Sequence, residues 1–214
     1  MFSRILLKYF SIPALSKYFM PKINRCGQAA VLSRQEMARL FRAIQSPSHR
    51  LIFAICRYTT ERISAVLKLE ILDVYDTKGK VRPIITFKGI NRKGSRGKPG
   101  KTRQVPVHPR LKELLDGYEV TPLCKWLFPN PVDPTKHISR QAADEALRRA
   151  CLKAGLGDAG VSTHTFRRTA ITELANSGVQ IRVIQEITGH ASLAQLKTYI
   201  EVSEDQVKEA IKLL

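Results

Sequence analysis

The sequence has few of the features that build disulfide frameworks, metal centres or membrane spans. It contains four scattered cysteines and no C-x-x-C pair: Cys26, Cys56, Cys124 and Cys151. This pattern argues against a structural zinc site and favours reduced thiols in the cytoplasm. No apolar run approaches the roughly 20 residues that a membrane-spanning helix requires. No carboxylate cluster has the character of a metal site, and no repeat is present, so we expect no cofactor, no metal and no membrane partner.

Acidic residues are scarce relative to basic ones. The 214 residues include 36 Lys and Arg against 18 Asp and Glu, which gives a formal net charge of +18. Such an excess is the electrostatic footprint of a protein that binds a polyanion, and nucleic acid fits better than a membrane surface. A basic soluble protein without such a partner is the alternative. The length suits one domain with a sizeable core and a small appendage.

The most informative stretch covers residues 163–199, where His164, Arg167, His190 and Tyr199 are separated by short apolar segments. His164 and Arg167 are three residues apart, so a helical segment would project both from one face. Arginine matches phosphate oxygens, histidine moves protons near neutral pH, and tyrosine can act as a covalent nucleophile. Spacing alone favours phosphoryl transfer no more than a helical DNA-binding subdomain with structural histidines and a half-buried tyrosine.

Hydrophobic periodicity predicts a mostly helical chain with one short stretch of strands. Helices are expected over residues 33–44, 49–59, 110–118 and 139–154. The first begins with a capping box formed by Ser33 and Glu36. Strand character over residues 71–75, 81–87 and 104–107 predicts a small antiparallel three-stranded sheet, so the expected fold class is α+β.

A strongly basic stretch begins after the second expected strand. From Lys88 to Arg110 the chain has eight Lys or Arg residues and no acid. A solvated, flexible hairpin would explain this composition. The functional alternative is a finger that follows the phosphates of a nucleic acid, because neutralising several phosphates releases counterions and raises affinity. The cations expected to contact DNA are Lys88, Arg92, Arg96, Lys98, Lys101 and Arg103.

The block at residues 163–199 resembles the C-terminal signature of the tyrosine recombinases, the phage-integrase family. The family pattern is H-x-x-R, then a Gly-His pair, then a tyrosine nine residues after that histidine. This chain has His164 and Arg167, then Gly189 and His190, then Tyr199, so the spacing matches at every step. A lone H-x-x-R is weak evidence, but the three parts in this order are strong.

A second stretch resembles the first box of the same family, T-G-x-R-x-S-E-x-L-x-L-x-x-x-D. Arg62 falls on the first catalytic arginine of that box, and the other matching positions are Ser64, Leu67, Leu69 and Asp73. Two departures stand out: Glu61 directly precedes Arg62, and Ala65 replaces the usual acid. A helix capped by Thr60 is expected here. The alternative for Arg62 is a cation on the surface of that helix.

The resemblance implies a site-specific recombinase or integrase that cuts and rejoins DNA through a 3′-phosphotyrosyl intermediate, without metal or ATP. Tyr199 would attack the scissile phosphorus, and Arg62 and Arg167 would bind the nonbridging oxygens, where charge builds in the transition state. His164 would take the tyrosine proton or donate to a phosphate oxygen. His190 would position the phosphate or the neighbouring helix.

The resemblance also implies a lysine general acid on the basic hairpin. Lys93 is the first choice, because I-T-F-K-G-I-N-R-K-G resembles relatives that place the lysine just before a glycine. Lys98 lies five residues before Arg103 and fits a version of the pattern with a shorter hairpin. Lys88 is the third choice. The sequence does not decide which of these three lysines is the general acid.

The expected organisation follows the same resemblance. Residues 31–202 would form a tyrosine-recombinase catalytic domain, residues 1–30 a leader or docking arm, and residues 203–214 a helix that could dock on a neighbouring protomer. Family members usually carry a further DNA-clamping domain before the first box, so the chain is expected to be a small single-domain member or a fragment.

The implied partners are double-stranded DNA, further copies of the chain as a dimer to tetramer on DNA, and an accessory DNA-bending or clamping protein. The expected location is the cytoplasm, in association with the nucleoid. Two other functions remain open at this point. One is a nicking and resealing enzyme similar to a type IB topoisomerase, and the other is a non-catalytic DNA-binding regulator on the same fold.

Overall fold

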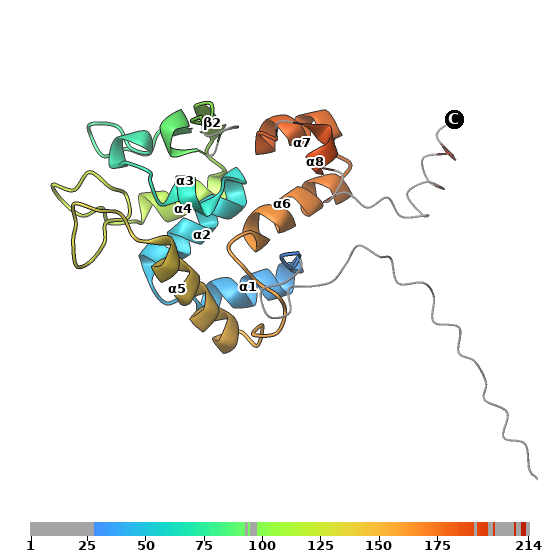
Figure 1. The fold of residues 1–214 in the computed structure, drawn as a ribbon, viewed down its shortest axis with the longest axis horizontal. Coiled ribbons are helices and arrows are strands. Elements are labelled where there is room, and N and C mark those ends of the chain that lie inside the picture. The colour runs from blue at the N-terminus through green and yellow to red at the C-terminus, as the bar shows by residue number, and fades with distance from the viewer. Residues whose placement is uncertain are drawn as a thin grey trace, which may run out of the picture.

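The computed structural model describes residues 28–92, 94, 98–190, 192–196, 199, 208, 211 and 212. They form a helical body with one small sheet, arranged as in Figure 1. The elements are α1 (Arg34–Ala43), α2 (Pro47–Thr59), α3 (Ile63–Val66), the 3-10 helix η1 (Ile71–Asp73), β1 (Ile84–Phe87), the 3-10 helix η2 (Gly89–Asn91), β2 (Arg103–Pro106), α4 (Pro109–Asp116), α5 (Arg140–Lys153), α6 (Thr165–Asn176), α7 (Ile181–Thr188) and α8 (Leu193–Leu196). None of the described helices combines the length and apolar character needed to cross a membrane.

Local signals explain where the first helices begin. The Ser33 hydroxyl accepts a hydrogen bond from the Glu36 amide, and the Glu36 carboxylate accepts one from the Ser33 amide at 2.9 Å, which confirms the predicted capping box of α1. Pro47 lies in the first turn of α2, where its missing N–H costs nothing, with Ser46 as the N-cap. The helix therefore starts two residues earlier than the sequence indicated.

The central element is α2, whose residues 51–56 are all buried. It contacts α3, α4 and α6. The rings of Phe53 and Phe166 stack with their centroids 4.9 Å apart, which joins α2 to the start of α6. Because offset aromatic pairs add to the effect of area burial, this contact fixes the first turn of α6 against the main core.

The sheet has two strands among the described residues, not the three expected. β1 and β2 pair antiparallel with Ile84 opposite Pro106 and Phe87 opposite Arg103. The segment expected as a third strand instead forms η1 and reaches its neighbour through one isolated bridge, between Tyr75 and Val81. Reciprocal hydrogen bonds explain the difference, because the side chains of Glu70 and Asp73 each accept from the backbone amide of the other and close a helical turn.

The junction after α2 also differs from the prediction. Thr60 does not begin a helix; it ends α2 in the left-handed region, with φ 55° and ψ 17°. Arg62 is the N-cap of α3. The chain therefore turns sharply between Thr59 and Arg62, and it carries Glu61 into the interior.

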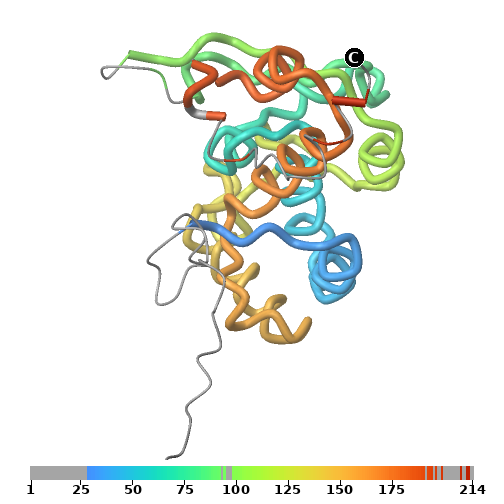
Figure 2. Tube along the Cα trace, turned by 90° about the vertical axis from the view of Figure 1, so that its right-hand side faces the viewer, coloured from blue at the N-terminus to red at the C-terminus, as the bar shows by residue number. Residues whose placement is uncertain are grey.

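Two hydrophobic clusters divide the molecule, and α6 belongs to both. The larger cluster contains Phe166 from the first turn of α6, and the smaller one contains Ile171 together with Ile184 and Leu196 from α7 and α8. Figure 2 shows α7 and α8 on the same side of the body as the hairpin between β1 and β2. Arg167 therefore lies on the helix that joins the two parts.

The expected leader and C-terminal helix fall almost entirely outside the described residues. Of residues 1–30 the structure describes 28–30, and of residues 203–214 it describes three positions. The sequence-based expectations for these two segments remain predictions.

Candidate active site

Four side chains predicted from the sequence come from four different parts of the fold. Arg62 caps α3, Arg167 lies in the first turn of α6, and His190 follows Gly189 at the end of α7. Tyr199 packs beside the smaller cluster after α8. The bend at Gly189, with φ 64°, requires the left-handed backbone that glycine adopts without strain, and it turns His190 back toward α6.

Arg167 is buried, with 4% of its surface exposed. Its guanidinium donates to the carbonyl oxygen of Thr60, and to that of Thr188 at 2.9 Å. Nη2 also lies 3.1 Å from Nε2 of His190. Burial, and next the positive charge of Arg62, lower the pKa of Arg167 to about 10. The side chain is therefore a cation at neutral pH, in a fixed orientation at the junction of α2, α6 and α7.

His190 is 9% exposed and contacts Arg167 directly. Burial, and next the charge of Arg167, lower its pKa to about 4, so the ring is neutral at pH 7. The Thr188 hydroxyl donates to the Gln185 carbonyl oxygen at 3.3 Å, which leaves its oxygen to accept from Nδ1 of His190 at 2.6 Å. That pairing assigns the proton to Nδ1 and leaves the Nε2 lone pair for Arg167.

Tyr199 is half-buried next to these groups. Its ring centroid lies 5.8 Å from that of His190 and 6.0 Å from the guanidinium carbon of Arg168. The Arg168 side chain in turn donates to the Ala29 carbonyl oxygen at 3.0 Å. A tyrosine between a cation and a neutral histidine lies in a positive environment, which suits the approach of a phosphate.

Arg62 is half-buried at the start of α3. Its positive charge lowers the pKa of both Arg167 and His190, so its guanidinium lies within electrostatic range of them. Within the described part of the chain, no carboxylate or carbonyl group pairs with that guanidinium. Its donors therefore remain available for an anion beside Arg167.

His164 differs from the expectation that it shares a helix face with Arg167. It is the N-cap of α6, just before the first helical residue, and it is exposed whereas Arg167 is buried. Its side chain is therefore accessible to solvent at the start of α6.

The basic hairpin divides into cations that face solvent and cations that face the protein. Lys98 and Lys101 are exposed. Lys88 forms ion pairs with Glu70 at 2.7 Å and Asp73 at 3.4 Å, and the hydrogen bond that it donates to Glu70 raises its pKa. Lys93 and Arg96, predicted as general acid and DNA contact, lie outside the described residues.

Arg92 and Arg103, which were predicted to contact DNA, point inward to a carboxylate that the sequence did not single out for the site. Glu61 accepts from Arg92 Nε at 2.9 Å and from Arg103 Nη1 at 2.8 Å. Its side chain is 1% exposed. Burial alone would raise the pKa of Glu61, but Arg103 and Arg92 outweigh that effect and keep it below its ordinary value. The carboxylate is therefore ionised.

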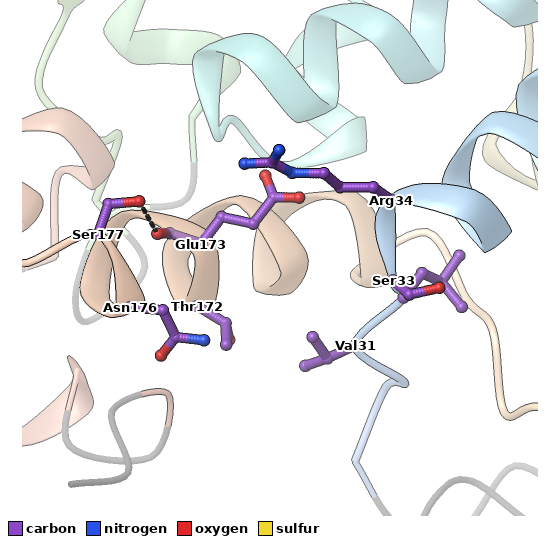
Figure 3. A pocket seen from close by; sticks show the side chains of 8 residues that line it. Val31, Ser33, Arg34, Thr172, Glu173, Asn176 and Ser177 are labelled. Atoms are coloured by element: carbon purple, nitrogen blue, oxygen red, sulfur yellow. Dashed lines mark hydrogen bonds between the residues drawn. The ribbon is translucent and has the colours of Figure 1, made fainter. Parts of the chain in front are cut away.

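A surface pocket of about 460 Å³ lies away from this cluster, between residues 31–34 and the C-terminal end of α6, where Thr172, Glu173, Asn176 and Ser177 line it. Figure 3 shows Arg34, Thr172, Glu173 and Asn176 around it, with the Ser177 hydroxyl donating to the Glu173 carbonyl oxygen at 2.8 Å. None of the residues predicted for chemistry lines this pocket. The pocket therefore adds nothing to the assignment of the site.

Solved structures of recombinases and integrases share this fold. The crystal structure of XerA recombinase aligns with a TM-score of 0.64 and 24% identity, over 89% of this chain and 66% of that one. The Tn1549 transposon integrase in complex with a circular intermediate DNA aligns with a TM-score of 0.69 and 16% identity, over 88% of this chain and 67% of that one. The catalytic domain of bacteriophage HP1 integrase aligns with a TM-score of 0.57 and 24% identity, over 86% of this chain and 95% of that one. The fold is that of a tyrosine-recombinase catalytic domain.

Sequence comparison gives the family. The tyrosine recombinase XerA of Pyrococcus furiosus is 29% identical over 186 residues, which are 85% of this chain and 60% of that protein. The tyrosine recombinase XerD of Mycobacterium leprae is 30% identical over 171 residues, 75% of this chain and 50% of that protein. The chain thus spans about half the length of the curated relatives it matches. The profile of the phage integrase family matches residues 30–206, and the chain belongs to that family.

Proposed function

We propose that this chain is the catalytic part of a site-specific DNA recombinase that cuts and rejoins DNA through a 3′-phosphotyrosyl intermediate. The observation that supports the proposal most directly is the cluster of Arg167, His190 and Tyr199, together with the charge of Arg62, which acts on both Arg167 and His190. Two guanidinium groups and a tyrosine match the needs of a phosphodiester under attack, which must have its charge neutralised and a nucleophile close by.

The proposed reaction forms one bond and breaks one bond at the scissile phosphorus. Tyr199 Oη bonds to phosphorus while the bond from phosphorus to the 5′ oxygen breaks. His164, exposed at the start of α6, takes the tyrosine proton, and a hairpin lysine gives a proton to the departing 5′ oxygen. Arg62 and Arg167 neutralise the nonbridging oxygens. The 5′ hydroxyl of another strand reverses the step, and the covalent link conserves the energy for it.

His190 has an indirect role in this scheme. Its ring is neutral at pH 7 and presents a lone pair to Arg167, so it fixes the orientation of that guanidinium rather than donating a proton. The hydrogen bond between Thr188 and His190 sets the tautomer that this role requires.

The hairpin lysine that acts as general acid is proposed to come from the loop between Arg92 and Arg103. Lys93 and Lys98 both belong to this loop, and Lys98 is exposed at its end. Lys88 precedes the loop and is paired with two carboxylates, which makes it the weakest of the three candidates. Separate replacement of each lysine by glutamine distinguishes them.

Double-stranded DNA is the proposed substrate. XerH site-specific recombinase has been solved bound to its difH substrate, and the Tn1549 integrase in complex with a circular intermediate DNA. The excess of positive charge and the exposed lysines of the hairpin support the same partner here. Further copies of the chain on the DNA and an accessory DNA-bending or clamping protein complete the proposal.

The test is the capture of protein bound covalently to DNA. Purified protein is mixed with supercoiled plasmid carrying the DNA that flanks its gene, and with nicked duplexes of the same sequence, and the mixture is denatured with SDS. We expect an adduct with the native chain and none with Tyr199→Phe. Relaxation of any plasmid without exchange between sites would favour the topoisomerase-like alternative. DNA binding without an adduct on nicked duplexes would favour the DNA-binding regulator.

A further inference from the structure

Glu61 is a buried carboxylate that touches both the catalytic box and the basic hairpin. Its Oε1 accepts from Arg92 Nε at 2.9 Å and from Arg103 Nη1 at 2.8 Å. Its Oε2 accepts from the backbone amide of Arg62 at 3.0 Å. A single side chain therefore joins the backbone of one proposed phosphate-binding arginine to two arginines of the hairpin.

Arg92 closes the base of the loop that carries Lys93 and Lys98. Its carbonyl oxygen accepts from the Gly100 amide at 3.0 Å, and its Nη1 donates to the Lys101 carbonyl oxygen at 2.6 Å. These two bonds connect the end of η2, where the chain enters the loop, to the residues just before β2, where it leaves. Arg92 therefore holds together the two described ends of the loop.

Arg103 lies where the chain leaves the hairpin loop, and it anchors that end of the loop to the body of the protein. It lies in β2, and its Nη2 donates to the Thr59 carbonyl oxygen at 3.0 Å. Both arginines also pack on the bend before His190, where a Cβ added to Gly189 would lie 3.1 Å from Arg92 Nη2 and 3.5 Å from Arg103 Cδ. The cluster therefore contacts three parts of the active site: the box at Arg62, the hairpin and the end of α7.

We propose that Glu61 is a positioning residue that fixes the hairpin loop relative to Arg62, so that the lysine on the loop reaches the 5′ oxygen as it leaves. This inference rests on the proposed recombinase function. It does not depend on whether Lys93 or Lys98 is the acid, because both lie within the loop that Arg92 closes. Lys88 lies outside that loop and interacts with Glu70 and Asp73.

The sequence around Glu61 supports a specific role for this acid. Ala65 stands where the family pattern has an acid, and it is buried at 3% exposure with no polar group in its side chain. The carboxylate at position 61 lies on the other side of Arg62 in the chain and faces the hairpin instead. This chain therefore has its acid at the one place from which it can bind Arg92 and Arg103 together.

The test separates proton donation to the leaving group from every other step. Two nicked duplexes share the cleavage site mapped by the adduct assay, one with the ordinary 5′ bridging oxygen and one with sulfur in its place. A thiol has a pKa of about 8.5, so sulfur leaves as the thiolate without a proton. The rate of covalent adduct formation is measured on both duplexes for the native chain, Glu61→Gln and the control Glu173→Gln.

The control removes a more exposed ion pair between a glutamate and an arginine, away from the hairpin. Glu173 pairs with Arg57 at 2.9 Å and joins α2 to α6. We expect Glu61→Gln to lose about 100-fold of the rate on the oxygen duplex, the scale of general acid catalysis, and to match the native chain within about threefold on the sulfur duplex. Glu173→Gln is expected to show the same ratio between the two duplexes as the native chain.

Other outcomes overturn the inference in distinguishable ways. Equal losses of Glu61→Gln on both duplexes, or no loss on either, would refute the positioning role while leaving the recombinase function intact. A native chain that forms no adduct on either duplex would refute the proposed function itself. If Glu61→Gln does not fold, Arg92→Met replaces it, because Glu61 keeps Arg103 as a partner while the loop base is detached, and the same criterion applies.

Discussion

At the scale of single residues, the orientation of Arg167 depends on acceptors that cannot easily move. Two of them are backbone carbonyl oxygens at helix ends, from Thr60 and Thr188, and the third is the ring of His190. A guanidinium fixed in this way needs little reorganisation when charge develops on a phosphate, and this is the main source of electrostatic catalysis. The protonation state of His190 therefore matters to both stability and activity.

The neutral ring of His190 predicts a loss of stability in acid. Burial, and next the charge of Arg167, lower its pKa from 6.5 to about 4, so the unfolded chain binds the proton more readily than the folded chain. The contribution is fully present above pH 6.5 and is lost as the pH falls to about 4. We expect the free energy of unfolding in urea to fall by on the order of 2 kcal/mol across this window.

His190→Gln is the matched variant for this measurement. Glutamine keeps hydrogen-bonding groups near Arg167 and Thr188 but does not titrate in this range. Its unfolding free energy should therefore change less than that of the native chain between pH 6.5 and about 4. Parallel curves for the two proteins would rule out His190 as the titrating group.

The left-handed backbone at Thr60 could not be predicted from residue types alone. A positive φ is uncommon for a β-branched residue, and threonine at this position reads more naturally as the N-cap of a helix. The family pattern has glycine there, and the left-handed backbone is the physical reason. The threonine hydroxyl lies 2.7 Å from the Thr59 carbonyl oxygen and 3.1 Å from that of Ile187, which compensates for part of the strain.

At the scale of elements, most structure that depends on neighbouring residues was predicted correctly, and structure that depends on residues far apart in the sequence was missed. The helices α1, α2, α4 and α5 were predicted because caps and apolar periodicity are local signals. The η1 turn was missed because its two capping carboxylates override strand-like residues. The role of Glu61 could not be predicted from spacing, since its partners lie 31 and 42 residues further along the chain.

The helices α6 and α7 each end at a glycine with a positive φ, and the stability cost of alanine is expected to differ between the two positions. Gly178 has φ 75° with open space where a methyl group would lie, whereas Gly189 has φ 64° with Arg92 and Arg103 against it. We expect Gly178→Ala to cost about 1 kcal/mol of stability from backbone strain alone. Gly189→Ala adds a steric contact with the arginine pair, and it should cost about 1 kcal/mol more.

The two variants also differ in their expected effect on chemistry. Gly189→Ala should slow adduct formation at temperatures where it remains folded, because the arginine pair and His190 must shift. Gly178→Ala should leave the rate near that of the native chain. Thermal melts and adduct assays on both proteins measure this, and equal rates for the two would contradict the contact between Gly189 and the hairpin cluster.

At the scale of the whole molecule, the excess positive charge is useful only where it meets phosphate. Lys98 and Lys101 are exposed on the hairpin, while Arg92 and Arg103 face Glu61. We expect Lys98→Gln/Lys101→Gln to reduce the slope of log affinity against log salt concentration by about 2, since each phosphate contact contributes about 1. Fluorescence anisotropy with a labelled duplex measures the slope.

A second double variant removes the same formal charge from elsewhere. Lys112 pairs with Asp116 on α4, and Lys136 pairs with Asp133. Lys112→Gln/Lys136→Gln should leave the slope close to that of the native chain. A comparable drop in both double variants would mean that net charge, rather than the hairpin, determines DNA affinity.

The division of the molecule into two hydrophobic clusters has a consequence for how it tolerates heat. Among the residues that the structure describes, the smaller cluster has three that are fully buried, Ile171, Ile184 and Leu196, and it supports the end of α7 that carries His190. Regions with few buried apolar contacts open at a lower free energy than the whole fold. Such an opening would separate His190 from Arg167 while α2 and its neighbours stay folded. We therefore expect activity to be lost on heating below the temperature at which the main body melts.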